Sequence, residues 1–374
     1  MVHNANSRRN EIDKDLEDSG EVTTRTRSLS GVWHTFFYIT AVAASLFHIG
    51  VNTLGFMVMP AIWRNACHLG FIMVMAFLLY PWSKKKPDKG MRFDLVLIAL
   101  SILVTAYILL FQQELHLERN SIPIMRDYIF AAIALVVLLI GTWRSSGYII
   151  PILSILFLSY ALFLGKIIPG TFHYRGVSLG RLLYRMYLTD EGIFGTICTI
   201  SSTYVFLFIL FGAFLLKSGA GDFIIKLAQA LAGRQIGGPA KIAVVSSGFM
   251  GSVSGSAVAN TVSTGSMTIP LMKKMGFKPT FAGGVEAAAS TVGQLMPPIM
   301  GAGAFIMAQW TGIPYLHIIA VAAIPAMMYF LTVGFFVHIE ALKMGMEPTK
   351  EEDIPKLKEV LKSGFVFLIP VGLL

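Results

Sequence analysis

The stretch Gly251-Ser-Val-Ser-Gly-Ser-Ala-Val-Ala-Asn260 decides how this chain folds. It lies inside a longer segment, residues 241–275, in which two apolar arms flank this small, polar, glycine-broken centre. Such a run is a poor single lipid-facing span, because non-helical backbone at membrane depth survives only when it is buried in protein or lines a wet cavity. We therefore expect a re-entrant helical hairpin that enters and leaves on the same side, with its tip near residues 252–256.

The next apolar segment, residues 279–310, is predicted to be a broken helix. Gly293-Gln-Leu-Met-Pro-Pro298 interrupts it, because proline lacks an N–H and disfavours the helical region for the residue before it. Half-helices that meet near mid-membrane present free carbonyls on one side and free N–H groups on the other, and secondary transporters use these to hold cations and anionic substrates. A structural kink is the alternative, but the polar hairpin tip in the preceding segment favours a site.

The whole chain has the composition of a polytopic helical membrane protein. Of its 374 residues, 55% are hydrophobic and 14% are charged, whereas soluble domains average about 45–50% and about 25%. Intrinsic disorder and nucleic-acid binding fit this composition poorly. A membrane span needs about 20 residues. Each span is expected to be helical, because in lipid the backbone N–H and C=O groups must bond to one another. The apolar windows lie near residues 33–59, 62–82, 93–112, 128–143, 147–169, 192–217 and 316–341.

The net charge of +9 is interpreted as a topology signal. With a cytoplasmic N-terminus, one crossing per window and a same-side hairpin, most of the 30 lysines and arginines lie inside. A plain span at residues 241–275 would instead move Lys273, Lys274 and Lys278 outside. The positive-inside rule therefore favours the hairpin.

Several motifs of this chain resemble a known family, the tripartite ATP-independent periplasmic (TRAP) transporters. The decapeptide quoted above, Ile269-Pro-Leu-Met-Lys-Lys-Met-Gly-Phe277 and Gly293-Gln-Leu-Met-Pro-Pro298 are similar to the large membrane subunit. More narrowly, two motifs resemble the fused permeases that pair with TAXI-type binding proteins: Arg181-Leu-Leu-Tyr-Arg-Met-Tyr-Leu-Thr-Asp-Glu-Gly192 and Val285-Glu-Ala-Ala-Ala-Ser-Thr291. Two further motifs resemble the N-terminal four-helix portion of those permeases: Arg64-Asn-Ala-Cys-His-Leu-Gly-Phe71 and Leu78-Leu-Tyr-Pro81.

The resemblance implies an all-α polytopic membrane fold. It comprises a four-helix N-terminal part and the first of two inverted repeats of an ion-transporter fold, with a re-entrant hairpin and a broken helix. The expected parts are a polar cytoplasmic tail (1–30), a four-helix small-subunit-like domain (31–146), a linking helix with an amphipathic segment (147–190), the first repeat of the large-subunit transport domain (191–341), and a cytoplasmic connector with the start of the next helix (342–374).

The implied function is sodium-coupled uptake of an organic anion, a carboxylate. A periplasmic TAXI-type binding protein delivers the anion, and the permease lies in the bacterial inner membrane with its N-terminus in the cytoplasm. Sodium is the coupling ion, and no cofactor and no nucleic-acid partner are expected. Neither a GxxxxGK[ST] nor an HExxH motif occurs in the sequence, which argues against ATP as the drive and against a zinc hydrolase.

The end of the sequence leads us to expect an incomplete transporter. The apolar run that begins at Phe365 stops at Leu374, whereas a span needs about 20 residues. We therefore expect the second repeat, with half of the cation and substrate sites, to lie outside this chain, and we expect this chain alone not to transport. The alternatives are an anion/sodium symporter without a binding protein and a non-transporting fragment.

Small oxygen ligands suit a hard cation such as sodium, and no Cys/His cluster suggests zinc or iron. By resemblance, the candidate sodium site is made of Ser254, Ser256, Asn260, Ser290, Thr291 and Gly293. The candidate substrate residues are Gly255, Gln294, Pro297 and Pro298.

Two alternatives stay open for this region. Tight packing through small residues would explain Gly265 and the alanines at 287–289, although it does not explain the serine-rich break. Glu286 is a carboxylate well inside a predicted span, and the cost of its charge in lipid means that it faces protein or water. It is expected either to help a cation site or to pair with a Lys or Arg.

Overall fold

The computed structural model describes residues 26–55, 59–82, 91–346, 354–367 and 369. The regular secondary structure of these residues is helical, as predicted. Seven helical segments of the described chain are long and apolar enough to cross a membrane, which confirms an all-α polytopic membrane protein. They are Gly31–Asn52, Ala61–Leu79, Met91–Glu118, Met125–Ser146, Ile149–Ile167, Thr196–Ala232 and Tyr315–Lys343.

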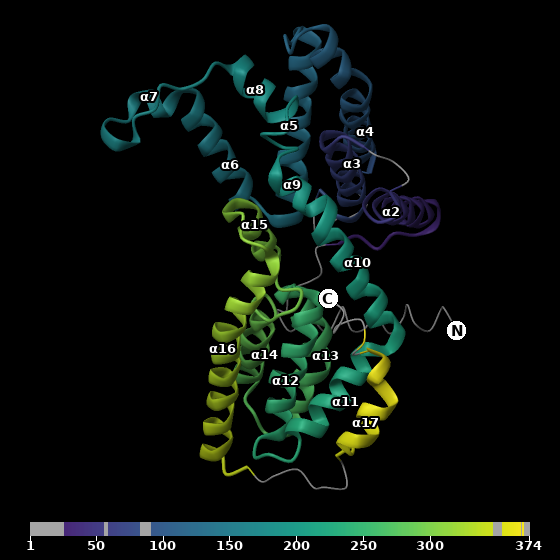
Figure 1. Ribbon diagram of the computed structural model, residues 1–374, viewed down its shortest axis with the longest axis vertical. Helices are drawn as coiled ribbons and strands as arrows, with labels where there is room; N and C mark the ends of the chain where they lie inside the picture. The colour runs from purple at the N-terminus through teal and green to yellow at the C-terminus, as the bar shows by residue number, and fades with distance from the viewer. Residues whose placement is uncertain (1–25, 56–58, 83–90, 347–353, 368, 370–374) are drawn as a thin grey trace. The chain divides into compact units, whose positions relative to one another are not determined.

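The chain forms two compact units, Met1–Thr199 and Ile200–Leu374. In the first unit, helix α3 packs against α2, α4 and α5, and α5 also packs against the amphipathic helix α8 (Figure 1). Its elements are α2 (Gly31–Asn52), α3 (Ala61–Leu79), α4 (Met91–Gln113), η1 (Glu114–Glu118), α5 (Met125–Ser146), α6 (Ile149–Ser159), η2 (Tyr160–Leu164), α7 (Gly165–Ile167), η3 (Gly170–Phe172), α8 (Leu179–Tyr187) and the start of α9 (Thr196–Ile200).

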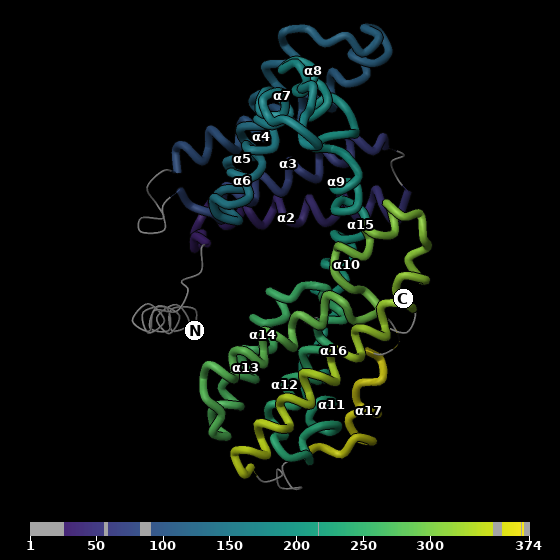
Figure 2. Tube along the Cα trace, turned by 90° about the vertical axis from the view of Figure 1, so that its left-hand side faces the viewer, coloured from purple at the N-terminus to yellow at the C-terminus, as the bar shows by residue number. Residues whose placement is uncertain are grey.

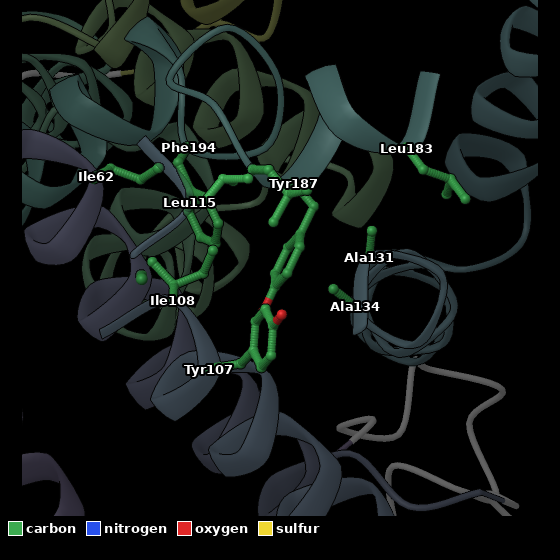
Figure 3. Close-up of a cluster of buried hydrophobic side chains, with 11 residues drawn as sticks. Ile62, Tyr107, Ile108, Leu115, Ala131, Ala134, Leu183, Tyr187 and Phe194 are labelled. Atoms are coloured by element: carbon green, nitrogen blue, oxygen red, sulfur yellow. The ribbon is translucent and has the colours of Figure 1, made fainter. Parts of the chain in front are cut away.

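The apolar core of the first unit joins α8 to the four-helix part. Leu183 and Tyr187 of α8 are buried against Ala131 and Ala134 of α5 (Figure 3). The side chains of Tyr187 and Tyr107 approach each other through their hydroxyl ends (Figure 3). The Tyr187 hydroxyl donates to the carbonyl of Val104, which satisfies a polar group that the core would otherwise bury at a cost. Helix α8, which lies within the predicted linking helix and amphipathic segment (147–190), therefore covers this core.

The second unit packs the hairpin arms and the broken helix together. Helices α12, α13 and α14 contact one another, and α16 contacts α12 and α14 (Figures 1 and 2). Small side chains such as Ala240, Ala243, Ala282 and Ala289 are fully buried there. The elements are η4 (Ser201–Val205), α10 (Phe206–Leu215), η5 (Leu216–Ala220), α11 (Gly221–Ala232), α12 (Gly238–Ser254), α13 (Ala257–Lys274), α14 (Pro279–Val292), α15 (Ala302–Thr311), α16 (Tyr315–Lys343), α17 (Leu357–Gly364) and η7 (Phe365–Phe367).

Two predicted windows differ from the structure. The first helix ends at Asn52 rather than near 59, because the chain turns at Gly55, which has a φ of +63°. The helical segment expected at 192–217 runs from Thr196 to Ala232 and bends at Gly219, whose φ of +103° is a conformation that glycine adopts most readily.

The remaining domain boundaries stay predictions. The predicted tail lies outside the described residues up to position 25, and so do residues 83–90 of the predicted four-helix domain. Most of the predicted final apolar run, at 368 and 370–374, is also outside them.

Candidate functional site

The predicted hairpin is a helix–turn–helix with its turn where the sequence places it. Helix α12 ends at Ser254, and Gly255 follows in the left-handed region with a φ of +62°. Ser256 caps the next helix, because its Oγ accepts a hydrogen bond from the backbone N–H of Ala259 at 3.3 Å. The prediction of a break within 252–256 is confirmed, whereas its depth and its side of the membrane stay predictions.

The broken helix is also present. Helix α14 ends at Val292 and α15 begins at Ala302, and the peptide bond between Pro297 and Pro298 is cis. The hydroxyl of Tyr315 donates to the carbonyls of Pro298, at 3.2 Å, and Ile299. A tyrosine from α16 therefore holds the loop between the two half-helices.

The prediction of free carbonyls at the end of α14 is wrong, because these carbonyls accept hydrogen bonds from the loop. The backbone N–H groups of residues 293–296 turn back and donate to the carbonyls of Ser290, Thr291 and Val292 at 2.8–3.2 Å. The loop satisfies these carbonyls because it curls into a further turn after the helix ends. These carbonyls are therefore not unsatisfied groups that call for a cation.

The hairpin turn and the helix break lie in contact. A Cβ atom built on Gly251 would lie 2.4 Å from the Cα of Gly293, and one built on Gly293 would lie 2.3 Å from the Cα of Gly251. A Cβ on Gly255 would lie 2.1 Å from the carbonyl oxygen of Met300, and the N–H of Ile299 donates to the carbonyl of Ser252 at 3.2 Å. Only glycine permits this backbone contact, so one small region unites the two predicted breaks.

Among the six predicted sodium residues, Asn260 has the environment that best fits a cation ligand. Its side chain is fully buried, and its Nδ2 donates to the carbonyl of Ser247 at 2.7 Å. Its Oδ1 finds no hydrogen-bond partner in the described part of the chain. Nδ2 lies 3.0 Å from the Cβ position of Gly251, which places Asn260 beside the contact between Gly251 and Gly293.

The other predicted sodium residues have local partners. Ser254 Oγ accepts from the N–H of Ser256 at 3.4 Å, and Ser256 caps α13. Thr291 is exposed and donates to the carbonyl of Ala287 at 2.8 Å, within its own helix. Ser290 is buried and donates to Glu286 at 3.1 Å. Gly293 takes part through its backbone contact with Gly251.

The predicted substrate residues are only partly brought together. Gln294 lines a cavity of about 740 Å³ next to α15 and α16, together with apolar residues such as Leu295, Met307 and Ile318. Its carbonyl accepts from the N–H of Gly301 at 2.8 Å. Gly255, Pro297 and Pro298 do not line this cavity. Their role in binding a substrate stays a prediction.

Glu286 lies in a cluster that the sequence did not predict. Its carboxyl is fully buried and contacts the hydroxyls of Ser247 on α12, Thr264 and Thr268 on α13, and Ser290 on α14. Of the two alternatives for Glu286, pairing with a Lys or Arg is not found among the described residues, because the salt bridges there join other side chains. The alternative that Glu286 helps a cation site stays a prediction. The signal that could have found the cluster is the spacing of Asn260, Thr264 and Thr268, which places three polar residues on one helix face.

Comparison with known proteins supports the relation of this chain to a transporter family. The sequence profile of the family described as "Tripartite ATP-independent periplasmic transporter, DctM component" matches residues 131–374. This range includes the hairpin, the broken helix and the Glu286 cluster.

Individual relatives match a shorter stretch. A protein of Sinorhizobium fredii, y4mL, is 30% identical over 166 residues, which are 44% of this chain and 39% of that protein. The C4-dicarboxylate TRAP transporter large permease protein DctM of Vibrio cholerae is 30% identical over 149 residues, 38% of this chain and 33% of the relative. The protein of the same name from Rhodobacter capsulatus is 36% identical over 91 residues, which are 24% of this chain and 21% of that protein. The chain thus spans about two fifths or less of the length of these relatives.

Proposed function

Because the chain belongs to the DctM component family of the tripartite ATP-independent periplasmic transporters, we propose that it is the permease part of a secondary transporter that takes up an organic anion across a bacterial inner membrane. A carboxylate is the substrate class that we favour. The relatives from Vibrio cholerae and Rhodobacter capsulatus, which are named for C4-dicarboxylates, support this choice.

The observation that carries the proposal is the contact between the hairpin turn and the helix break. It brings the fully buried side chain of Asn260, whose Oδ1 has no partner among the described residues, beside Gly251, the glycine that contacts Gly293. A buried acceptor without a donor costs free energy, and a bound sodium ion would remove that cost by accepting its lone pair. Sodium entry is a useful drive, because the membrane potential supplies about 2.3 kcal/mol per charge per 100 mV.

The proposal extends to the architecture and the partner. A periplasmic binding protein of the TAXI type would deliver the anion, and residues 31–146 would act as a fused small subunit. The second repeat, with the remaining half of the site, would lie outside this chain, and the N-terminus would be cytoplasmic. The motifs at 181–192 and 285–291 support the TAXI type, and the packed helices α2–α5 support the small-subunit assignment.

Uptake by vesicles tests the proposed activity. Right-side-out membrane vesicles from cells that express the gene at its native locus should accumulate a labelled C4-dicarboxylate when sodium and the cognate binding protein are added. Vesicles from a deletion strain are the control. Uptake without a binding protein would favour the alternative of a simple anion/sodium symporter. Equal uptake by both strains would contradict the proposal.

Cysteine labelling tests the orientation. Single cysteines at Lys274 and Lys343 should react only with reagents that reach the cytoplasm, and cysteines at Arg119 and Tyr315 only with reagents outside the cell. Labelling of position 274 from outside would rule out a same-side hairpin.

A further inference from the structure

The first unit contains a cavity to whose side chains the proposed function assigns no role. Its volume is about 590 Å³, and it is lined by residues from the start of α3, the end of α4, η1, α8 and the turn after α8. Six of the lining residues lie in the motif at 181–192. Cavities of about 300–1,000 Å³ are typical of small-molecule sites, so this one has room for a ligand.

Two arginines of α8 line this cavity and have different surroundings. Arg181 and Arg185 stand about one turn apart on the same face of the helix. Arg185 pairs with Glu191 at 3.3 Å. The guanidinium of Arg181 has no hydrogen bond or ion pair with any described residue, since the bond of this residue to Ser178 Oγ comes from its backbone N–H. The cavity therefore contains one positive charge that the described part of the chain leaves unpaired.

Asp190 supplies an unpaired negative charge to the same cavity. Its carboxylate is a lining group and stands in the turn that follows α8. Within the described ranges, no lysine, arginine or histidine pairs with it, and Arg181 is included in that statement. The cavity thus presents one guanidinium and one carboxylate that do not neutralise each other.

The turn that carries Asp190 is fixed against α8. The N–H of Ile193 donates to the carbonyl of Met186 at 2.8 Å. A Cβ atom on Gly192 would lie 2.5 Å from the Cα of Met186, so only glycine lets the chain return this close to the helix. The fold therefore sets the backbone positions of Asp190 and Arg181 relative to each other.

Other walls of the cavity are also held in place. Leu183 and Tyr187 bury the inner face of α8 in the core of the unit. His116 of η1 lies 3.3 Å from the carbonyl of Leu188 through Nε2 and 2.8 Å from Ser121 Oγ through Nδ1. A site whose walls are fixed before binding loses little conformational entropy when a ligand enters.

Neutral groups complete the lining. The side-chain amide of Gln112 and the hydroxyl of Tyr184 line the cavity, and neither forms a hydrogen bond with a described residue. Ala61 and Ile62 at the start of α3 add an apolar wall. The cavity therefore offers hydrogen-bonding groups of both kinds beside its two unpaired charges.

The two charges select among possible ligands. A simple anion would be attracted by Arg181 and repelled by Asp190, and a simple cation would meet the reverse. A molecule that carries both charges pairs with both side chains at once. Because Arg181 and Asp190 are exposed, water weakens each single contact, and a ligand needs both contacts to bind measurably.

We propose that this cavity is a binding site for a small zwitterion of the amino-acid class. The carboxylate of the ligand pairs with Arg181 and its ammonium group pairs with Asp190, while Gln112 and Tyr184 hydrogen-bond its remaining polar atoms. The site lies within the first unit, so it requires neither the proposed sodium site nor the proposed transport activity.

Equilibrium dialysis of the purified full chain in lipid nanodiscs tests the proposal. Each protein amino acid is offered as a labelled probe at millimolar concentration, beside the matched carboxylic acid without the amine and the matched amine without the carboxylate. At least one amino acid should bind saturably. Its two single-charge analogues should bind at least about tenfold more weakly, because each lacks one charge-assisted contact. Equal binding of either analogue, or no binding of any amino acid, would overturn the proposal.

Two variants locate the bound probe. Arg181→Gln and Asp190→Asn should each raise its dissociation constant at least about tenfold, and both should keep the fold because the two positions are exposed. Arg175→Gln and Glu118→Gln are the matched controls, since these charged residues are exposed and do not line the cavity. They should bind the probe as the wild type does.

Two further outcomes count against the site. Unchanged binding in either Arg181→Gln or Asp190→Asn would place the amino acid elsewhere. If no amino acid binds but both variants weaken the docking of the periplasmic binding protein, the cavity is a protein contact and the proposal is wrong. Amino-acid binding is measured without uptake, so a failure of the proposed transport activity would be seen separately.

Discussion

The two units bury polar groups in different ways. In the first unit, Asp94 lies between two arginines, with Arg27 at 2.8 Å and Arg144 also in contact, and the three side chains are 2–3% exposed. In the second unit, Glu286 has hydroxyl partners only, and the Oδ1 of Asn260 finds no donor among the described residues.

This difference suggests a structural role for the buried polar groups of the first unit and a binding role for those of the second. Buried charges that are paired and hydrogen-bonded have a fixed arrangement and little affinity for anything else. A buried carboxyl and a buried amide oxygen that lack positive partners are groups that a bound cation would stabilise. The first unit therefore has the character of a rigid support, and the site that we propose in the second unit would lie where α12, α13 and α14 meet.

The largest expected effect comes from breaking the buried ion pairs of Asp94 in the first unit. Asp94→Asn removes the carboxylate that Arg27 and Arg144 share, and we expect a loss of about 3–5 kcal/mol in stability, because breaking a buried pair leaves uncompensated charge. Thermal unfolding of the purified protein measures it. Glu191→Gln is the matched control, because its pair with Arg185 at 3.3 Å is exposed and is worth about 0–1 kcal/mol. Equal effects of the two changes would contradict the scaffold role.

The second prediction tests the backbone contact of the second unit. Gly293→Ala places a methyl group 2.3 Å from the Cα of Gly251, and overpacking of this kind costs about 1–3 kcal/mol. We expect lower thermal stability and a loss of sodium-dependent uptake. A Cβ atom on Gly284 of α14, the helix that ends just before Gly293, meets no atom within 4 Å, so Gly284→Ala should leave both measurements unchanged. Full sodium-dependent uptake by Gly293→Ala would show that the contact is dispensable.

The third prediction addresses the unpartnered oxygen. Asn260→Ala removes Oδ1, and the sodium concentration for half-maximal uptake should rise about tenfold, which corresponds to about 1.4 kcal/mol. Thr261→Ala is the control from the next position, since its Oγ1 bonds the carbonyl of Ala257 at 2.9 Å in its own helix. An unchanged sodium dependence in Asn260→Ala would remove this residue from the proposed site.

The smallest expected effect concerns the cap of α13. Ser256→Ala removes the acceptor for the N–H of Ala259, and the loss of a helix cap costs about 1 kcal/mol. A modest fall in melting temperature is expected, together with a higher sodium requirement if Ser256 also contacts the ion. Ser266→Ala, an exposed position within the same helix, is the control. Equal melting temperatures for the two variants would show that the cap contributes nothing.

The local features of the second unit could be predicted well. Gly255 and the serines around it marked the hairpin turn, and Pro297 and Pro298 marked the helix break, because glycine and proline act on the backbone where they stand. The lengths of the apolar windows similarly predicted the spans, with errors at Asn52 and Ala232. These errors arose where glycines bend or end a helix inside an apolar run.

The partners within the site could not be predicted in the same way. The sequence placed Ser254, Ser256 and Thr291 in the sodium site, but these side chains form hydrogen bonds with residues two to four positions away in the chain. For Glu286 it left open a role in a cation site or a pair with a Lys or Arg, and it did not indicate the hydroxyls from three helices that surround the carboxyl. Which side chains meet depends on the rotation of each helix about its axis, and that rotation is set by packing between helices.

By itself, the sequence determined the class of the protein, the approximate spans and the two places where the helices break. These features follow from short-range physics, because lipid requires satisfied backbone groups and glycine and proline act within a turn. Only the tertiary structure decided that Gly251 meets Gly293, that the end of α14 satisfies its own carbonyls, and that Glu286 is enclosed by hydroxyls. Those contacts join residues far apart in the chain, and they exist because small side chains let α12, α13 and α14 approach closely enough for their polar groups to meet.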